Sequence, residues 1–286
     1  MRAALFTLIY PIRGVAVTLL LLLPLHLTAE SLPLQFGVVP QQSARKLAED
    51  WGPMLAYIEQ TSGIHLRFAT APSIPEFEKR VAAGDYAFAY MNPYHYTVFS
   101  KSPGFRAIAN ARDSKINGIM VTRKDAPYQQ LEALQGLTLA FPAPAAFAAT
   151  ILQRATLRNL GVATTPKFVS SHDSVYRAVA AGLYPAGGGI MRTFNALTPE
   201  IRDQLRILST TPGYTPHAIA VHPTVDSAMA AKVQRAFIAL EESEEGRQLL
   251  QPMKIKGWQA ATDADWDDVR ALNIDLLDNL IESDTP

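Results

Sequence analysis

Short apolar segments alternate with amphipathic segments along most of the chain, and no other feature of the sequence constrains the fold as strongly. Residues 34–39 form an apolar run that predicts a strand, and Leu47, Trp51 and Leu55 then recur at helical spacing. Strands that alternate with helices favour parallel sheets built from βαβ units. The sequence therefore predicts an α/β fold, and in such sheets ligands bind beyond the carboxyl ends of the strands.

The same pattern continues towards the C-terminus. We expect strands at residues 34–39, 64–69, 86–90, 105–111, 118–122, 137–141, 168–169, 186–190, 205–208 and 215–221. We expect helices around Leu47–Ile58, at 74–83, from Pro93, and at 145–160, 173–181, 226–241, 244–251 and 263–281. We expect these elements to form two lobes, with the chain crossing from the first lobe to the second near residues 118–125 and returning near residues 210–218. The predicted lobes are residues 30–120 with 214–286, and residues 121–213.

The N-terminus has the composition of a secretory signal peptide. Residues 1–29 hold Arg2 and Arg13, no acid, and an apolar run at 15–25, and they end in small residues just before Glu30. This pattern predicts export to the periplasm and a mature chain that begins near Glu30. Leu27 lies three positions before the expected cleavage point and suits it poorly, so retention as an uncleaved anchor stays open.

Composition excludes several classes of function. The 286 residues are 48% hydrophobic and 18% charged, which suits two folded lobes and argues against disorder. Basic and acidic residues are equal in number, so nothing favours a nucleic-acid partner. The absence of cysteine removes disulfides, thiol nucleophiles and thiolate metal sites. The histidines show no metal-ligand spacing, and no nucleophile-elbow motif is present. We therefore expect no metal, no cofactor and no enzymatic activity.

Several local strings occur in an order typical of a known family. They are Gln41-Gln42-Ser43 after the first predicted strand, Ala-Tyr-Met-Asn-Pro at 89–93, the strand–turn–helix at 139–150, Ser-His-Asp-Ser at 171–174 and the glycine-rich strand after Gly182. With these strings the chain resembles the phosphate/phosphite/phosphonate-type substrate-binding proteins of ABC transporters, over roughly residues 34–276. The resemblance implies a two-lobed type II periplasmic-binding fold, each lobe a mostly parallel sheet flanked by helices. It also implies that the C-terminal segment completes the first lobe.

The chain departs from this family at the ligand-binding positions. Where the family carries a Ser-Thr-Ser run at a helix start, this sequence has Ala146, Phe147 and Ala148. A family tyrosine falls near Ile74, and a family acid is replaced by Pro185. Each charge-assisted hydrogen bond lost in this way is worth about 1.5–3 kcal/mol. We therefore expect a small organic ligand with at most one strongly anionic end.

Candidate ligand-binding residues lie at predicted strand ends and helix starts. Tyrosine pairs a flat apolar body with a hydroxyl, which suits a cleft, and Arg192 is the best cation for an acidic ligand. The resemblance implies that His172 contacts the ligand. Capping alone would also explain Asp173, and close packing explains Gly187–Gly189 better than an anion cradle does. The predicted ligand-binding residues are Gln41, Gln42, Tyr90, Asn92, Tyr94, Ala146, Phe147, His172, Asp173 and Arg192.

Two functions remain open from the sequence. The first is a monomeric periplasmic solute-binding protein that delivers its ligand to the membrane permease of an ABC transporter. The alternative is a ligand-sensing receptor whose closed form engages a membrane histidine kinase. Both use the same two-lobed clamp, so the sequence does not separate them.

Overall fold

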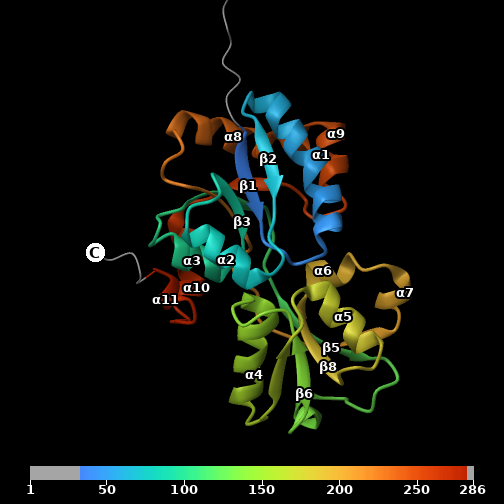
Figure 1. The fold of residues 1–286 in the computed structure, drawn as a ribbon. Helices are drawn as coiled ribbons and strands as arrows, with labels where there is room; N and C mark the ends of the chain where they lie inside the picture. The colour runs from blue at the N-terminus through green and yellow to red at the C-terminus, as the bar shows by residue number, and fades with distance from the viewer. Residues whose placement is uncertain (1–32, 282–286) are drawn as a thin grey trace, which may run out of the picture. The chain divides into compact units, whose positions relative to one another are not determined.

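The strands of the computed structural model, which describes residues 33–281, form two sheets (Figure 1). The first sheet has the order β11-β4-β10-β3-β1-β2 and the second β7-β6-β8-β5-β9. The first contains β1 (Leu34–Val38), β2 (Leu66–Ala69), β3 (Phe88–Met91), β4 (Arg106–Ala111), β10 (Ala218–Val221) and β11 (Trp258–Ala260). The second contains β5 (Gly118–Arg123), β6 (Thr138–Phe141), β7 (Thr165–Phe168), β8 (Ala186–Ile190) and β9 (Leu205–Thr210). All of these strands belong to one compact unit.

Both sheets are mixed, so the α/β prediction is confirmed but the expectation of mostly parallel sheets is wrong. The pairs β1–β2, β1–β3, β6–β7 and β6–β8 are parallel. The remaining pairs, which involve β4, β5 and β9–β11, are antiparallel. Parallel neighbours need a crossover connection, whereas β5 and β10 enter their sheets from the other sheet and can run the opposite way. The edge strand β11 was not predicted because three residues carry too little periodicity.

The helices of the described residues surround these sheets. They are α1 (Ala44–Ser62), α2 (Ile74–Ala82), α3 (Pro93–Phe99), η1 (Leu131–Leu134), η2 (Phe147–Leu152), α4 (Gln153–Asn159), α5 (His172–Ala180), α6 (Met191–Asn195), α7 (Pro199–Arg202), α8 (Ser227–Ala239), η3 (Leu240–Glu242), α9 (Glu244–Leu250), η4 (Asp263–Trp266), α10 (Asp267–Arg270) and α11 (Asp278–Ile281). Side chains of Ser43, Ser73, Asn92 and Ser171 accept backbone N–H groups at the starts of α1, α2, α3 and α5. None of these helices is long and apolar enough to cross a membrane. The predicted signal peptide lies outside the described residues.

Two helix predictions are wrong in detail. The helix expected at 145–160 begins with the six-residue π-helical segment η2 before α4 continues it. The helix expected at 263–281 is divided into η4, α10 and α11, and Asn273, which adopts a left-handed backbone conformation with φ of 49°, separates α10 from α11. Asparagine tolerates this conformation better than most residues, and it ends helices for that reason.

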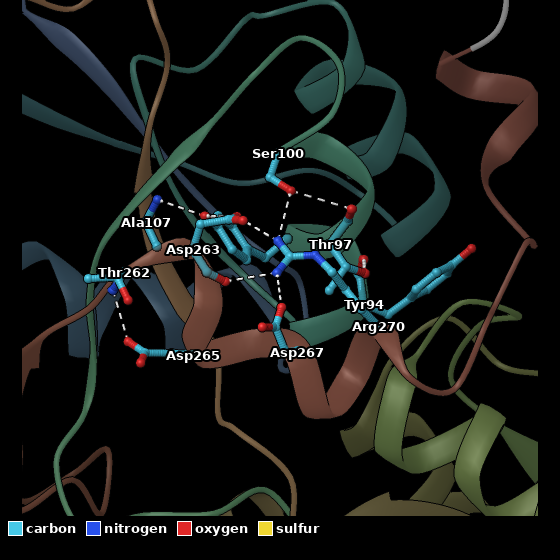
Figure 2. Close-up of polar contacts among 10 residues, drawn as sticks. Tyr94, Thr97, Ser100, Ala107, Thr262, Asp263, Asp265, Asp267 and Arg270 are labelled. Carbon is cyan, nitrogen blue, oxygen red and sulfur yellow. Dashed lines mark hydrogen bonds and ion pairs between the residues drawn. The ribbon is translucent and has the colours of Figure 1, made fainter.

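The C-terminal segment is fixed to α3 by polar contacts (Figure 2). Asp263 accepts hydrogen bonds from Arg270 at 2.5 Å and from the hydroxyl of Tyr96 at 2.8 Å. Arg270 also donates to Asp267 at 2.8 Å. The hydroxyl of Tyr94 accepts the backbone N–H of Leu277 at 2.9 Å. Residues 263–277 are thereby attached to the part of the chain that carries the first sheet.

The first sheet packs in one apolar cluster, which also includes η2 and Ile190 of β8, and the second sheet packs in two smaller clusters, one on each face. In the first, Phe36 lies at the centre, with ring centroids of Trp51 and Phe237 at 5.4 and 5.8 Å. In the second, consecutive residues of β5 face opposite sides, as strand geometry requires. Ile119 packs in a cluster with residues of α5, whereas Met120 packs with Leu139, Phe141 and others on the other face. Figure 1 shows α4 and α5 on the two sides of this sheet.

Two chain segments connect the sheets. The chain passes from β4 to β5 through residues 112–117 and returns from β9 to β10 through residues 211–217. Ile116 and Tyr214 exchange two backbone hydrogen bonds of 2.8 and 3.1 Å, so the two connections pair with each other. The hydroxyl of Thr211 also accepts the N–H of Gly118 at 2.9 Å. Both connections fall close to the predicted crossings.

Candidate ligand-binding site

The start of η2 is the first feature of the candidate site. The chain leaves β6 at Phe141, turns through residues 142–146 and enters η2 at Phe147. The first N–H groups of a helix have no acceptor inside the helix, and the helix dipole favours negative charge near them. Ala146 has no side chain that could cap them. The helix start therefore offers backbone donors without hydroxyl groups.

Glycines in the second sheet hold η2 directly against the strands. A Cβ atom on Gly118 of β5 would lie 2.1 Å from the carbonyl oxygen of Ala148. A Cβ atom on Gly188 of β8 would lie 1.9 Å from that of Ala149. On the other side of β8, a Cβ atom on Gly189 would meet the hydroxyl of Tyr176 at 2.1 Å. The glycine-rich strand thus serves close packing, as the sequence interpretation favoured.

A small cavity lies at the start of η2 and is lined from both sheets. Its volume is about 10 Å³, close to the minimum that holds one water molecule. The lining residues carry no hydroxyl group and no cation. They are Val39, Gln41, Ile74, Asn92, Ile116, Ala146, Phe147, Ala148, Ala149, His172 and Ile190. We call this space the helix-start cavity.

His172, the first residue of α5, is one of three polar side chains that line the helix-start cavity, with Gln41 and Asn92. It is 2% exposed, and its Nδ1 lies 3.1 Å from the hydroxyl of Thr193. Burial, with a smaller effect of the charge on Arg192, lowers the pKa of His172 to about 3. His172 is therefore neutral at pH 7, and within residues 33–281 its Nε2 has no hydrogen-bond partner.

Several hydrogen bonds join residues next to the first sheet to residues next to the second, and three of them lie at the starts of α5 and η2. The backbone carbonyl of Gln41 accepts the N–H of His172 at 3.0 Å. The carboxylate of Asp173 accepts the N–H of Ser43 at 3.3 Å. Asn92 donates from Nδ2 to the carbonyl of Ala145 at 3.1 Å. The ends of β1 and β3 are thereby fixed close to the starts of α5 and η2.

Next to this cavity, Gln41 is hydrogen-bonded to both Arg192 and His217, and we call these three residues the polar group. The guanidinium of Arg192 donates to Oε1 of Gln41 at 2.5 Å, and Nε2 of Gln41 lies 2.7 Å from Nε2 of His217. The ring of Tyr90 stacks on His217 with centroids 5.0 Å apart, and Arg192 lies 5.7 Å from the centre of the Tyr90 ring. Burial raises the pKa of Tyr90 and lowers that of His217, so both are neutral at pH 7.

A larger cavity of about 210 Å³ lies on the other side of this polar group. It shares Ile116 and Ile190 with the helix-start cavity. Tyr90, Arg192 and His217 line it, together with residues of both connecting segments. We call it the arginine cavity.

The structure brings together eight of the ten predicted site residues. The helix-start cavity is lined by Gln41, Asn92, Ala146, Phe147 and His172, and the arginine cavity by Tyr90 and Arg192. The carboxylate of Asp173 forms the hydrogen bond to Ser43 described above. Gln42 lines neither cavity. Tyr94 also lines neither, because its hydroxyl is used by Leu277 in the core of the first sheet. Burial raises the pKa of Tyr94 to about 12.

Sequence reasoning missed His217 and Thr193. His217 lies just before β10, on the segment that returns to the first sheet, and no local pattern distinguishes it. The polar environment of both residues comes from parts of the chain far away in the sequence. Within residues 33–281, no three histidine or acidic side chains are grouped as metal ligands.

Comparisons with known proteins agree with this architecture. Residues 36–266 match the model of a family described as ABC transporter, phosphonate, periplasmic substrate-binding protein. No curated protein sequence matches the chain at a significant level.

Solved structures show the same fold. A binding protein component of an ABC phosphonate transporter from Pseudomonas aeruginosa is 17% identical, with a TM-score of 0.77 over 84% of this chain and 85% of that chain. PhnD1 from Prochlorococcus marinus in complex with methylphosphonate is 16% identical, with a TM-score of 0.75 over 84% and 98%. XAC2383 from Xanthomonas citri bound to ATP is 15% identical, with a TM-score of 0.63 over 84% and 94%. The predicted two-lobed periplasmic-binding fold is confirmed by these likenesses.

Proposed function

The chain belongs to the family of periplasmic substrate-binding proteins of phosphonate ABC transporters, and we propose that it captures a small organic ligand between its two sheets. The observation that carries this proposal is the helix-start cavity, whose lining comes from the ends of β1 and β3 and from the starts of η2 and α5. Ligands of open α/β sheets bind at such strand ends and helix starts.

Closure of two lobes explains why the helix-start cavity is so small. At about 10 Å³ it admits one water molecule, so a ligand enters only when the sheets separate. We place the lobes at residues 30–120 with 214–286 and at residues 121–213. The membership of the strands in the two sheets supports this division except at β5, which lies in the second sheet although residues 118–120 fall in the first lobe. The paired connections at Ile116 and Tyr214 are suited to act as the hinge.

Small-angle X-ray scattering tests the closure. The radius of gyration should decrease when a saturating ligand is added to protein from which bound molecules have been removed by partial unfolding and refolding. An unchanged radius at saturation would contradict a clamp.

The ligand we propose is not a phosphonate. A doubly charged oxyanion needs several donors, and the lining of the helix-start cavity has backbone N–H groups but no hydroxyl and no cation. Phe147 instead presents an aromatic ring, which packs edge-to-face on Tyr214 with centroids 5.5 Å apart. An apolar or flat ligand body suits this surface better than an oxyanion does.

Calorimetry against phosphate, phosphite and methylphosphonate tests the ligand class. The wild-type chain should bind none of them more tightly than high micromolar. The triple variant Ala146→Ser, Phe147→Thr, Ala148→Ser should gain affinity for methylphosphonate, because it restores three hydroxyl donors at the helix start. Submicromolar binding of any of the three anions to the wild type would overturn this part of the proposal.

The partner we propose is the membrane permease of an ABC transporter, and the family is a substrate-binding component of transport rather than a group of enzymes. Sensing through a membrane histidine kinase would use the same clamp. Genes for a permease and an ATPase next to this gene would support transport, and a kinase gene in their place would support sensing. Pull-down of the chain with the encoded permease, in the presence and absence of ligand, tests the first partner directly.

A further inference from the structure

Arg192 is a half-buried cation that no acid within residues 33–281 neutralises. It lies in α6, directly after the glycine-rich strand β8. The one hydrogen bond of its guanidinium within residues 33–281 goes to Oε1 of Gln41, and the guanidinium forms no ion pair there. A guanidinium has five N–H donors, and partly buried charges in proteins are usually paired. Four of the five N–H donors of Arg192 therefore have no partner within the described residues.

The arginine cavity has a strongly basic lining. Besides Arg192 it is lined by Lys115 and Lys254, and no aspartate or glutamate is among its lining residues. Lys115 has a carboxylate of Asp268 at 3.8 Å, whereas Lys254 has no ion-pair partner within the described residues. The volume of about 210 Å³ is more than ten times the ~10–15 Å³ that one water molecule needs on the same measure. This cavity has room and charge for an organic anion.

Two neutral donors also face the arginine cavity. The hydroxyl of Tyr90, a residue only 3% exposed, has no hydrogen-bond partner among residues 33–281. Gln41 fixes the tautomer of His217: its amide oxygen accepts from Arg192, so its Nε2 donates and Nε2 of His217 must accept. The proton of neutral His217 is therefore on Nδ1, which has no partner within the described chain.

We propose that the ligand is a small organic acid whose carboxylate binds Arg192 and the hydroxyl of Tyr90 in the arginine cavity, while its less polar part extends past Ile116 and Ile190 towards Phe147. This inference rests on the proposed function and places the anionic end away from the helix start. The planar fork of a guanidinium matches the two oxygens of a carboxylate. Ile116 and Ile190 line both cavities, so they mark the boundary across which the less polar part of one ligand would extend.

Calorimetry with a fixed panel of carboxylates tests this proposal. The panel is propionate, lactate, succinate, glutarate and glutamate, each compared with the corresponding neutral amide and with methylphosphonate. At least one carboxylate should bind the wild type below 1 mM, and its amide should bind at least tenfold more weakly. Arg192→Gln should lose at least tenfold in affinity, Arg192→Lys less, and Tyr90→Phe severalfold.

Arg235→Gln is the matched control, because Arg235 is exposed on α8, and its affinity should equal that of the wild type. Thermal unfolding of each variant shows whether it is folded. Should Arg192→Gln fail to fold, Tyr90→Phe and the carboxylate–amide comparison still decide the question.

The outcomes separate this inference from the proposed function. If no carboxylate of the panel binds, or if one binds equally well to Arg192→Gln, the inference is overturned. Tight binding of methylphosphonate that is unaffected by Arg192→Gln would also overturn the inference. It would leave intact the proposed function, which is capture of a small ligand between the two sheets. Native mass spectrometry of protein taken from the periplasm tests the proposed function separately: a co-purified small molecule of any class supports capture of a solute.

Discussion

Replacement of Gly188 by alanine should damage both stability and ligand binding. The added Cβ atom would lie 1.9 Å from the carbonyl oxygen of Ala149 and 2.7 Å from a ring carbon of Phe141. Cβ contacts shorter than 3.0 Å essentially do not occur, so β8 and η2 would have to separate by about 1 Å. The carbonyl belongs to the backbone and cannot move away by changing a rotamer. The start of η2, which lines the helix-start cavity, would shift with it.

The expected magnitude follows from known effects of overpacking. Such substitutions cost about 1–3 kcal/mol, and more where backbone must move. We expect Gly188→Ala to lose at least about 2 kcal/mol of unfolding free energy. At about 2–4 °C per kcal/mol for a protein of 150–250 residues, the Tm should fall by about 4–8 °C.

The neighbouring residue provides a matched control. A Cβ atom on Gly187 would meet a methyl group of Val175 at 2.5 Å, on the opposite face of the same strand, and a backbone carbonyl, that of Ala140, only at 3.0 Å. A side chain can adjust where a backbone carbonyl cannot, and alanine also gains about 0.5–1 kcal/mol over glycine within a strand. Gly187→Ala should therefore lose about 1 kcal/mol or less and keep its ligand affinity.

Urea unfolding and calorimetry of both variants measure these differences. Equal stability of the two variants, or a larger loss for Gly187→Ala, would refute the argument that η2 rests directly on β8.

Three further predictions concern other parts of the molecule. Tyr94→Phe should lower the unfolding free energy by about 1–3 kcal/mol, because the N–H of Leu277 loses its acceptor. Ligand affinity should stay unchanged, and a loss of affinity would show that Tyr94 contacts the ligand. The pKa of His172 is about 3 in the folded chain and about 6.5 in the unfolded chain. Between pH 3 and pH 6.5, His172 is therefore protonated only in the unfolded chain. Stability should therefore fall as the pH drops from about 6.5 towards 3, by up to ~1.4 kcal/mol per unit for this group, and urea titrations should show a shallower fall in His172→Asn. N-terminal sequencing of protein from the native host should begin near Glu30, and recovery of the full-length chain from the cytosol would disprove export.

The sequence alone determined the order of the elements and the class of fold. Helical spacing from Leu47 to Ile58 and the apolar run at residues 34–39 correspond to α1 and β1, because one amphipathic face or one apolar run is a local property. Capping of a helix by serine or asparagine also depends only on neighbouring residues, so the starts of α1, α2 and α3 were predictable.

Only the tertiary structure decided the direction of strands and the composition of the site. The sheets are mixed because the chain changes sheet twice, which no single segment reveals. The sequence proposed both Tyr90 and Tyr94 for the site. In the structure the hydroxyl of Tyr94 bonds Leu277, whereas Tyr90 lines the arginine cavity. The group of Gln41, Arg192 and His217 assembles from three distant parts of the sequence. Its charge, its tautomer and the cavity beside it arise from contacts between the two sheets, and such contacts leave no pattern in the neighbouring residues.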